Sequence, residues 1–504
     1  MTAGLGRLAT LAPFGVGVVV LVLLAPSLMP GVGFWDTAEF QTAPPVLGTM
    51  HPTGYPTYVL LGFVANLLLA PIGEPAFRMN AMSLLCVAFA AGVTVHLARR
   101  LTGWTAIAIA AGLGMALTPI TWRIATLADA HALHLAFVAL LVTLLVHWED
   151  AHGAGRPGAD RWLVAAAVTF GLSAGNHSLT LLLAIPVGLY VLAVDPRIIR
   201  RPRLVVGCLA ALLGPLALVY LELPVRSGMV PAPLVYASPN TWDGFWYIAL
   251  AEQFRGSFGD PLSDLGRKAS ELWAFAGAQL GAFAAVAPIG FLAMVGRQPR
   301  LALLTGSAML VTLVFNLSYS NADIERYYLG PALFAWLWLA VLFGVIVDQV
   351  AGSGSNGRRA ILPGAMSVVL SVALLVPTGL AYPARTSLLD RSSDTSADRW
   401  LDAALDEIEA DAVVISWWAY STPLWYAQYV EGRRPDILVV DDRTRLDRDF
   451  GEVPDVIERF LGARPVYVMR VGNEIGPIMR LYDLVRLTAP ADNVYLVTGR
   501  KDPA

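Results

Sequence analysis

Two acidic residues near the start of the chain have the type and spacing of a catalytic pair. Asp36 and Glu39 are three positions apart, so a helix over this segment would place both carboxylates on one face. They follow a long apolar stretch, and a carboxylate drawn into hydrocarbon costs about 2.5–3.5 kcal/mol, so acids at such a boundary need a partner or a function. A general base that takes a proton from a hydroxyl is a function that suits them. A solvated loop helix is the simpler explanation when the pair is considered alone.

Further polar residues stand beside other apolar segments. His51 and Tyr55 each precede a proline, which restricts both itself and the residue before it, so this loop is stiff. Each of the others has an ordinary explanation, such as a snorkelling arginine, an interfacial histidine or a tyrosine of the aromatic belt. Together they indicate a site, because the topology described below brings all of them to one side of a membrane. They are Arg78, Asn80, Arg123, Asp129, His131, His134, Asn176, His177, Arg226, Asp323, Arg326, Tyr327 and Tyr328.

This set of side chains suits the transfer of a sugar from a lipid phosphate. Arginines bind phosphate through forked, charge-assisted hydrogen bonds, and aromatic rings suit the face of a sugar. A carboxylate suits a base that takes the proton of an acceptor hydroxyl, the sugar would face Asp36, and the same carboxylates would stabilise positive charge that develops at the sugar carbon. We therefore predict that Asp36 and Glu39 are catalytic. We predict substrate binding by His51, Tyr55, Arg78, Asn80, Asp129, His131, Asn176, His177, Arg226, Asp323, Arg326 and Tyr327.

The elements that must position these residues are long apolar segments. Of 504 residues, 56% are hydrophobic and 14% are charged, whereas about a quarter of a soluble domain is charged, so most of the chain is expected to lie in lipid. About eleven segments approach the roughly 20 residues that a membrane span needs. They are 8–29, 79–98, 104–120, 131–147, 162–175, 178–194, 203–221, 272–295, 299–318, 328–349 and 360–381. Nothing in the composition indicates a nucleic-acid partner, a disulfide or a zinc site.

The apolar stretch 56–71 decides the orientation of everything after it. Inner loops of membrane proteins carry an excess of Lys and Arg. If this stretch stays on the outer side of the membrane, every basic cluster lies in an inner loop. If it crosses the membrane, most of the clusters lie outside. The clusters are Arg99–Arg100, Arg156 with Arg161, Arg197 with Arg200, Arg201 and Arg203, Arg297 with Arg300, and Arg358–Arg359. We therefore expect the N-terminus inside, the C-terminus outside, and two long outer loops, 30–78 with juxtamembrane helices and 222–271.

The chain changes character near Tyr382, after which it is charged and mixed. The apolar runs 413–416, 437–440, 466–469 and 494–497 are typical of buried strands, and helical patterns lie near 397–410, 422–431, 452–462 and 475–487. This alternation predicts a small parallel α/β domain over 382–504, which follows a membrane domain over 1–381. Trp417 and Trp418 could stack on sugars, but core packing explains them more simply.

Several motifs are similar to those of a known family. The motifs are Trp35-Asp36-Thr37-Ala38-Glu39-Phe40, His51-Pro52-Thr53-Gly54-Tyr55-Pro56, Arg78-Met79-Asn80, Gly175-Asn176-His177, Leu223-Pro224-Val225-Arg226-Ser227, Arg326-Tyr327-Tyr328 and segments of 416–436. They resemble the protein O-mannosyltransferase-like family of the GT-C glycosyltransferases, formerly known as a transmembrane domain of unknown function. The resemblance spans nearly the whole chain. One departure is that family members often have a glutamate and then a tyrosine where this chain has Asp129 and His131.

The resemblance implies a polytopic α-helical GT-C fold and an inverting glycosyltransferase with Asp36 as the catalytic residue, beside Glu39. The expected donor is mannose linked to a polyprenyl phosphate. The expected acceptor is a hydroxyl outside the cytosol, on a Ser or Thr of a secreted protein, on a lipid or on a glycan. The resemblance leaves the use of a divalent cation undecided, and the oxygens of Asp36, Glu39 and Asp129 are its candidate ligands.

Two other functions remain open. A transporter or flippase for a lipid-linked or anionic solute is one, but it would place ionisable groups near the bilayer midplane and often has two related halves, and the sequence shows neither. A non-catalytic sugar-binding or assembly protein that works through its tail domain is the other. In each case the protein is a multi-pass membrane protein, in the inner or plasma membrane if it is bacterial.

Overall fold

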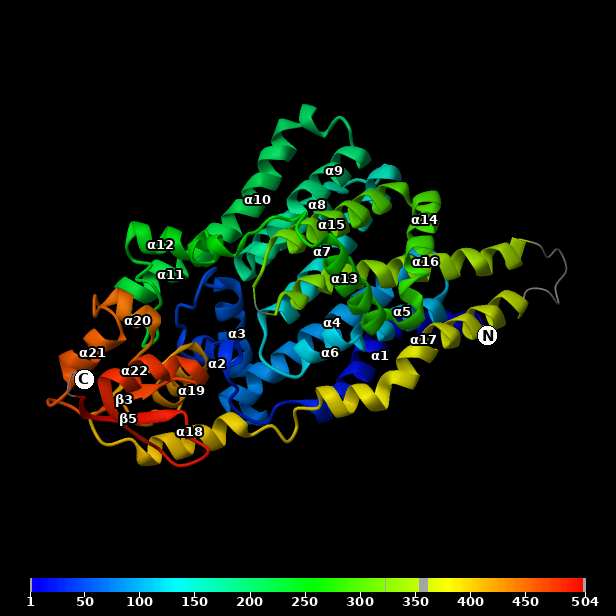
Figure 1. Ribbon diagram of the computed structural model, residues 1–504. Helices are drawn as coiled ribbons and strands as arrows, with labels where there is room; N and C mark the ends of the chain where they lie inside the picture. The colour runs from blue at the N-terminus through cyan, green and yellow to red at the C-terminus, as the bar shows by residue number, and fades with distance from the viewer. Residues whose placement is uncertain (1, 322, 353–360, 502–504) are drawn as a thin grey trace.

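Long apolar helices form most of the chain, and a small sheet domain follows them (Figure 1). The computed structural model describes residues 2–321, 323–352 and 361–501. A proline at the first or second position begins α4, α6, α10, α14 and α15, where its missing N–H costs no helical hydrogen bond. The helices of the membrane body are α1 Thr2–Leu24, α4 Pro75–Thr102, α5 Thr105–Ala116, α6 Pro119–Ala125, α7 Ala130–Gly153, α8 Asp160–Asn176, α9 Ala184–Val194, α10 Pro202–Tyr220, α13 Leu265–Leu280, α14 Ala287–Arg297, α15 Pro299–Ser318, α16 Leu329–Gly352 and α17 Ile361–Leu389.

Each of the eleven predicted spans coincides with helix, but not every helix has the length of a full span. Within the described residues, seven helices are long and apolar enough to cross a membrane, or nine if each bent pair is one span. The bends are 66° between α5 and α6 and 65° between the helical stretch Leu265–Ala284 and α14, and each second helix has a proline at its first or second position. The other two predicted spans are short, since α8 has 17 residues and the second is the helical stretch Ser178–Val194. The count of eleven and the orientation therefore stay predictions.

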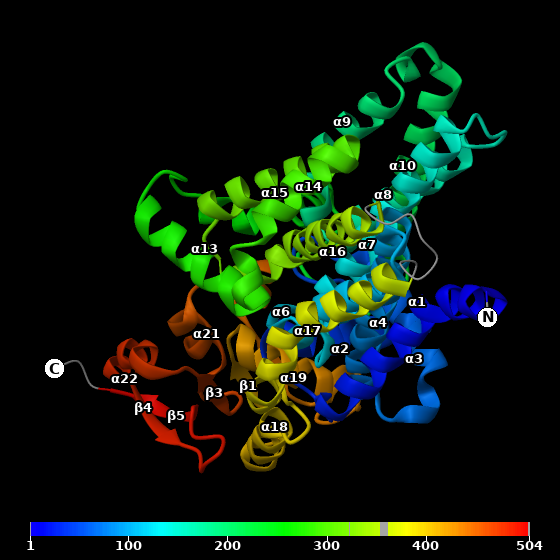
Figure 2. The ribbon, with the colours of Figure 1, turned by 90° about the vertical axis from the view of Figure 1, so that its right-hand side faces the viewer.

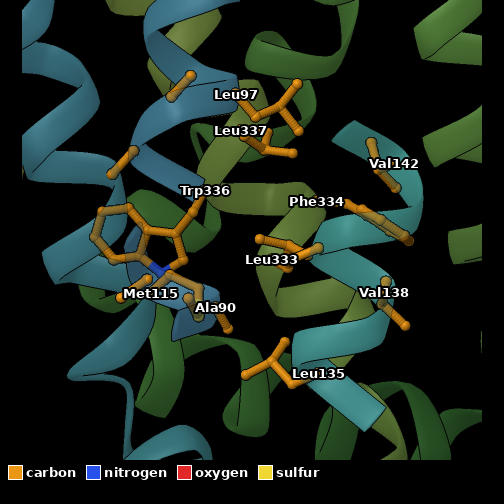
Figure 3. Close-up of a cluster of buried hydrophobic side chains, with 14 of the residues drawn as sticks. Ala90, Leu97, Met115, Leu135, Val138, Val142, Leu333, Phe334, Trp336 and Leu337 are labelled. Carbon is orange, nitrogen blue, oxygen red and sulfur yellow. The ribbon is translucent and has the colours of Figure 1, made fainter. Parts of the chain in front are cut away.

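The core of the membrane body lies between α4, α5, α7 and α16 (Figure 3). Trp336 of α16 is 1% exposed. It fits against α5 because residue 114 is glycine, where an added Cβ would lie 2.2 Å from the indole ring. A Cβ at Gly171 would likewise lie 2.2 Å from the carbonyl oxygen of Leu212, so α8 and α10 touch backbone to backbone. Small residues at such contacts are the means by which helices associate in lipid, where the hydrophobic effect between helices is absent.

Three regions of the chain meet at one end of the helix bundle, away from the N-terminus (Figures 1 and 2). The first is the predicted first outer loop, 30–78, with α2 Trp35–Val46 and α3 Pro56–Leu68. The second is the predicted second outer loop, 222–271, with α11 Glu222–Pro224 and α12 Trp242–Ala249, and the third is the C-terminal domain. The 13 residues of α3 extend only about 20 Å, which is less than the roughly 30 Å of a hydrocarbon core. This length is consistent with the prediction that 56–71 does not cross.

The C-terminal domain has a five-stranded sheet in the order β2-β1-β3-β5-β4. Its elements are α18 Ser396–Glu407, β1 Val413–Ile415, α19 Trp418–Tyr429, β2 Leu438–Val440, α20 Asp442–Asp447, α21 Val453–Phe460, β3 Val466–Met469, α22 Gly476–Leu481, β4 Tyr482–Arg486 and β5 Val494–Arg500. All four predicted strands are present, but the prediction of an all-parallel sheet is wrong, because β5 pairs antiparallel with both β3 and β4. The helix predicted over 475–487 ends at Leu481 and gives way to β4. The connection from β4 to β5 is too short for a crossover, so the two strands form an antiparallel pair.

Candidate active site

Arg326 brings together carboxylates from three distant parts of the chain. Its Nη1 donates to Oδ2 of Asp129 at 3.2 Å and its Nη2 to Oδ2 of Asp323 at 3.0 Å, while Nη2 lies 3.5 Å from Oδ2 of Asp36. The Arg326 side chain is 13% exposed and that of Asp129 is 3% exposed, so this pair is largely desolvated, whereas Asp36 and Asp323 are 32% and 42% exposed. All four residues belong to the predicted site, and the structure brings all four into one cluster.

Asp36 is the most accessible acid that faces this cluster from the first outer loop. It lies in the first turn of α2, where the helix dipole favours a negative charge, and its side chain is 32% exposed. Its Oδ1 accepts a hydrogen bond of 2.8 Å from the indole N–H of Trp418, the first residue of α19 in the C-terminal domain. Asp36 therefore has a fixed orientation and remains open to a substrate. The interpretation of Trp418 as a core residue missed this contact, for which the sequence carries no signal beyond a tryptophan pair.

Glu39 lies one turn further along α2 in a different environment, since it is fully buried. Its Oε1 accepts a hydrogen bond of 2.9 Å from the backbone N–H of His51, and its Oε2 is hydrogen-bonded to Nδ1 of the same residue. The other ring nitrogen of His51 lies 3.1 Å from the hydroxyl of Tyr55. Burial raises the pKa of Glu39, and although burial lowers the pKa of His51, the Glu39 carboxylate raises it by more. Glu39 thus holds the loop 47–55 against α2, and its predicted catalytic role stays a prediction.

The upward pKa shifts of Glu39 and His51 predict a pH-dependent stability. Both groups hold protons more tightly in the folded protein, so the folded state binds more protons than the unfolded state, and stability falls as pH rises through the raised values. We expect the thermal midpoint of the wild type to fall above pH 6.5, the ordinary pKa of His51. The double variant Glu39→Gln/His51→Asn should have a flatter profile. Melting curves in detergent over this range measure the difference, and equal slopes would contradict it.

Asp129 and His131 form the second acid–histidine pair of the site. Asp129 precedes α7 and caps it, because its Oδ1 accepts from the backbone N–H and from Nδ1 of His131, each at 2.8 Å. Burial would raise the pKa of Asp129, but Arg326 and His131 lower it by more. Nε2 of His131 is buried and has no hydrogen-bond partner among the described residues. This nitrogen is therefore a buried polar atom whose hydrogen bond the described residues do not supply.

The remaining aromatic and amide residues form the wall beside His131. Its ring lies 4.6 Å from the His177 ring and stacks on Tyr327 at 5.7 Å, measured between centroids. His177 accepts a hydrogen bond of 3.0 Å at Nδ1 from the backbone N–H of Leu179, and its ring lies 5.5 Å from that of Tyr55. Asn176 donates to the carbonyl of Ala130, which joins the end of α8 to the start of α7. The structure thus brings together His131, Asn176, His177, Tyr327 and Tyr55, as the sequence predicted.

Three of the predicted substrate-binding residues form hydrogen bonds with the protein backbone in this structure. Asn80 donates to the carbonyl of Met29 and accepts from the side chain of Gln41 and the backbone N–H of Ala128. Arg226 donates to the carbonyl oxygens of Val46 and Leu47, each at 3.0 Å, at the end of α2. Arg78 donates to the carbonyl oxygens of Gly73 and Asn66. These contacts fix the loop that carries Asp36 and Glu39, and contact of the three residues with substrate stays a prediction.

The acids Asp36, Glu39 and Asp129 do not share one cage of oxygen atoms. Each has its own partners, namely Trp418 and Arg326 for Asp36, His51 for Glu39, and His131 and Arg326 for Asp129. In the part of the chain that the structure describes, no group of three or more His, Cys, Asp or Glu side chains is placed to hold a metal ion. Binding of a divalent cation by Asp36, Glu39 and Asp129 stays a prediction.

Solved structures of other proteins share the fold of this chain over nearly its whole length. ArnT from Cupriavidus metallidurans bound to undecaprenyl phosphate is 14% identical, with a TM-score of 0.59 over 99% of this chain and 98% of that chain. The archaeal oligosaccharyltransferase AglB from Archaeoglobus fulgidus, in complex with an inhibitory peptide and a dolichol-phosphate, is 13% identical, with a TM-score of 0.56 over 97% of this chain and 74% of that chain. At such identities the likeness establishes the fold, and this chain has the fold of the GT-C membrane glycosyltransferases.

The sequence comparisons find similarity to one protein family. Residues 36–198, which begin at Asp36 and include His177, match the model of the Protein O-mannosyl-transferase TMEM260 N-terminal domain. The chain is also 28% identical over 460 residues to Protein O-mannosyl-transferase TMEM260 of Mus musculus, which covers 86% of this chain. It spans 62% of the length of that relative. The resemblance to the protein O-mannosyltransferase-like family is therefore confirmed.

Proposed function

We propose that this protein is an inverting membrane glycosyltransferase that moves a sugar from a polyprenyl-phosphate donor to a hydroxyl acceptor. The observation that carries the proposal is the position of Asp36, a partly exposed acid held between Arg326 and Trp418 in a chain with the GT-C fold. A base in this position needs an accessible carboxylate and a nearby cation for the phosphate, and Asp36, with a side chain 32% exposed, and Arg326 supply them.

The reaction would be a single displacement. Asp36 accepts the proton of the acceptor hydroxyl while the acceptor oxygen forms a bond to the anomeric carbon of the sugar. The bond from that carbon to the phosphate oxygen breaks, and its electron pair leaves with the polyprenyl phosphate, so the configuration inverts. Arg326, which lies beside Asp36, would bind the phosphate. The phosphate is a good leaving group, so no separate strong acid is required.

The donor, the acceptor and the side of the membrane are parts of the same proposal. Mannose and a Ser or Thr acceptor are supported by the name of the mouse relative, and a polyprenyl-phosphate donor by the lipid phosphates bound to the proteins of like fold. The location of the site outside the cytosol is supported by the basic clusters, such as Arg99–Arg100 and Arg297 with Arg300, which lie at the ends of helices away from Asp36.

A transfer assay tests the proposal. The full-length protein is purified in nanodiscs and incubated with radiolabelled polyprenyl-phosphate sugars, mannose first, and with Ser- and Thr-containing peptides, glycans or lipids as acceptors. We expect label to move to one acceptor class, with release of polyprenyl phosphate and an inverted linkage. If no donor is consumed with any acceptor, while vesicles that contain the protein take up or flip a lipid-linked or anionic solute, the protein is a transporter or flippase.

A further inference from the structure

The only described side chain of the C-terminal domain with a hydrogen bond to Asp36 is that of Trp418. The indole N–H of this residue donates to Oδ1 of Asp36 at 2.8 Å, across 382 positions of sequence. The other carboxylate oxygen of Asp36 faces Arg326 at 3.5 Å. The two oxygens of the proposed base are therefore held by different parts of the chain, one by the membrane body and the other by the sheet domain.

The Trp418 ring has little freedom to move. It packs edge-on against the rings of His51, Tyr236 and Trp425, with centroid distances of 5.3, 6.1 and 5.7 Å. These rings belong to the first outer loop, the second outer loop and α19 itself. The helix α19 is docked in turn on the membrane body, because the Tyr426 hydroxyl accepts a hydrogen bond of 3.0 Å from the backbone N–H of Ala76 at the start of α4.

We propose that Trp418 is a positioning residue for the transfer reaction, and that the C-terminal domain thereby completes the active site. This inference rests on the proposed function. Without the indole N–H, the freed oxygen of Asp36 can turn toward Arg326, and a carboxylate that binds a guanidinium with both oxygens is held away from an acceptor hydroxyl. The indole keeps one oxygen occupied by a neutral donor, so that Asp36 stays oriented toward the open side of the site.

The adjacent tryptophan supplies a matched control. The indole nitrogen of Trp417 is buried and has no hydrogen-bond partner among the described residues, and its ring lies edge-on to Trp35 at 5.0 Å. Trp417→Phe therefore removes an indole N–H that has no hydrogen bond to any described residue, whereas Trp418→Phe removes the indole N–H that donates to Asp36. Both variants keep an aromatic ring in the same turn, and thermal midpoints establish that both are folded.

The kinetic test compares kcat and the donor KM for the wild type and these two variants. We expect Trp418→Phe to lower kcat by about 10- to 100-fold, as the loss of one hydrogen bond to a charged group would, with little change in the donor KM. Trp417→Phe should stay within about threefold of the wild type. Equal losses in the two variants, or a loss confined to KM, would assign Trp418 to packing or donor binding and overturn the inference.

A second measurement separates this inference from the proposed function, because it needs no turnover. In protein labelled with 15N at the tryptophan indoles, the Trp418 signal is identified by its loss in Trp418→Phe, and it should shift in Asp36→Asn while the Trp417 signal does not. If the wild type transfers sugar but the Trp418 signal has the same chemical shift in Asp36→Asn as in the wild type, the inference is wrong and the proposed function stands. If the signal responds but the wild type transfers nothing, the proposed function fails and the positioning role with it.

Discussion

Replacement of Asp36 with asparagine should lower the rate of sugar transfer by about 100- to 10,000-fold, the range over which a positioned general base contributes. Asparagine has nearly the shape of aspartate, and its side-chain oxygen can still accept the indole hydrogen bond that Asp36 accepts from Trp418. It cannot accept the proton of a hydroxyl, and it loses the charge interaction with Arg326. The measurement is the initial rate of transfer of radiolabelled sugar under single-turnover conditions, with donor binding measured separately.

The control for this prediction is an acid on the same side that lies outside the cluster. Asp243 is exposed at the start of α12 in the second outer loop, and Asp243→Asn should leave the transfer rate unchanged. If Asp36→Asn keeps more than about a tenth of the wild-type rate, Asp36 is not the base. The proton would then have to pass to another group of the site, for which Asp129 would be the first candidate.

Replacement of Arg326 with glutamine should be the most destabilising change in the site. It leaves Asp129, whose side chain is 3% exposed, as a buried carboxylate without its arginine partner. The loss of one partner from a buried ion pair costs about 3–5 kcal/mol of folding free energy. We expect a clear fall in the thermal midpoint of the detergent-solubilised protein, together with a loss of donor binding measured with labelled polyprenyl-phosphate sugar.

A neighbouring arginine and a double variant isolate the cause of this destabilisation. Arg123 also pairs with Asp323, but the two side chains are 35% and 42% exposed, so Arg123→Gln should cost only about 0–1 kcal/mol. The double variant Arg326→Gln/Asp129→Asn should recover much of the lost stability, because it removes the unpaired buried charge. A cost for Arg326→Gln no greater than that for Arg123→Gln would show that the charge cluster does not stabilise the fold.

Local patterns in the sequence were enough to predict most elements of the fold. Apolar length predicted a helix for each of the eleven candidate spans, and short apolar runs predicted four of the five strands. The pairing direction of β5 and the strand β4 were missed, because the direction of a strand depends on its partners and not on its own residues. A short edge strand such as 482–486 has little burial to give it a pattern.

The sequence by itself also determined which residues gather in the site, because a membrane limits where polar groups can lie. Once the topology was inferred, Asp36, Asp129 and Arg326 had to be at the same boundary, and the structure brings them into contact. Only the tertiary structure decided their individual states. Glu39 is buried against His51 while Asp36 stays open, and Trp418 reaches Asp36 from the other end of the chain. Such contacts depend on how separate elements dock, and docking leaves no periodic signal in the residues that make it.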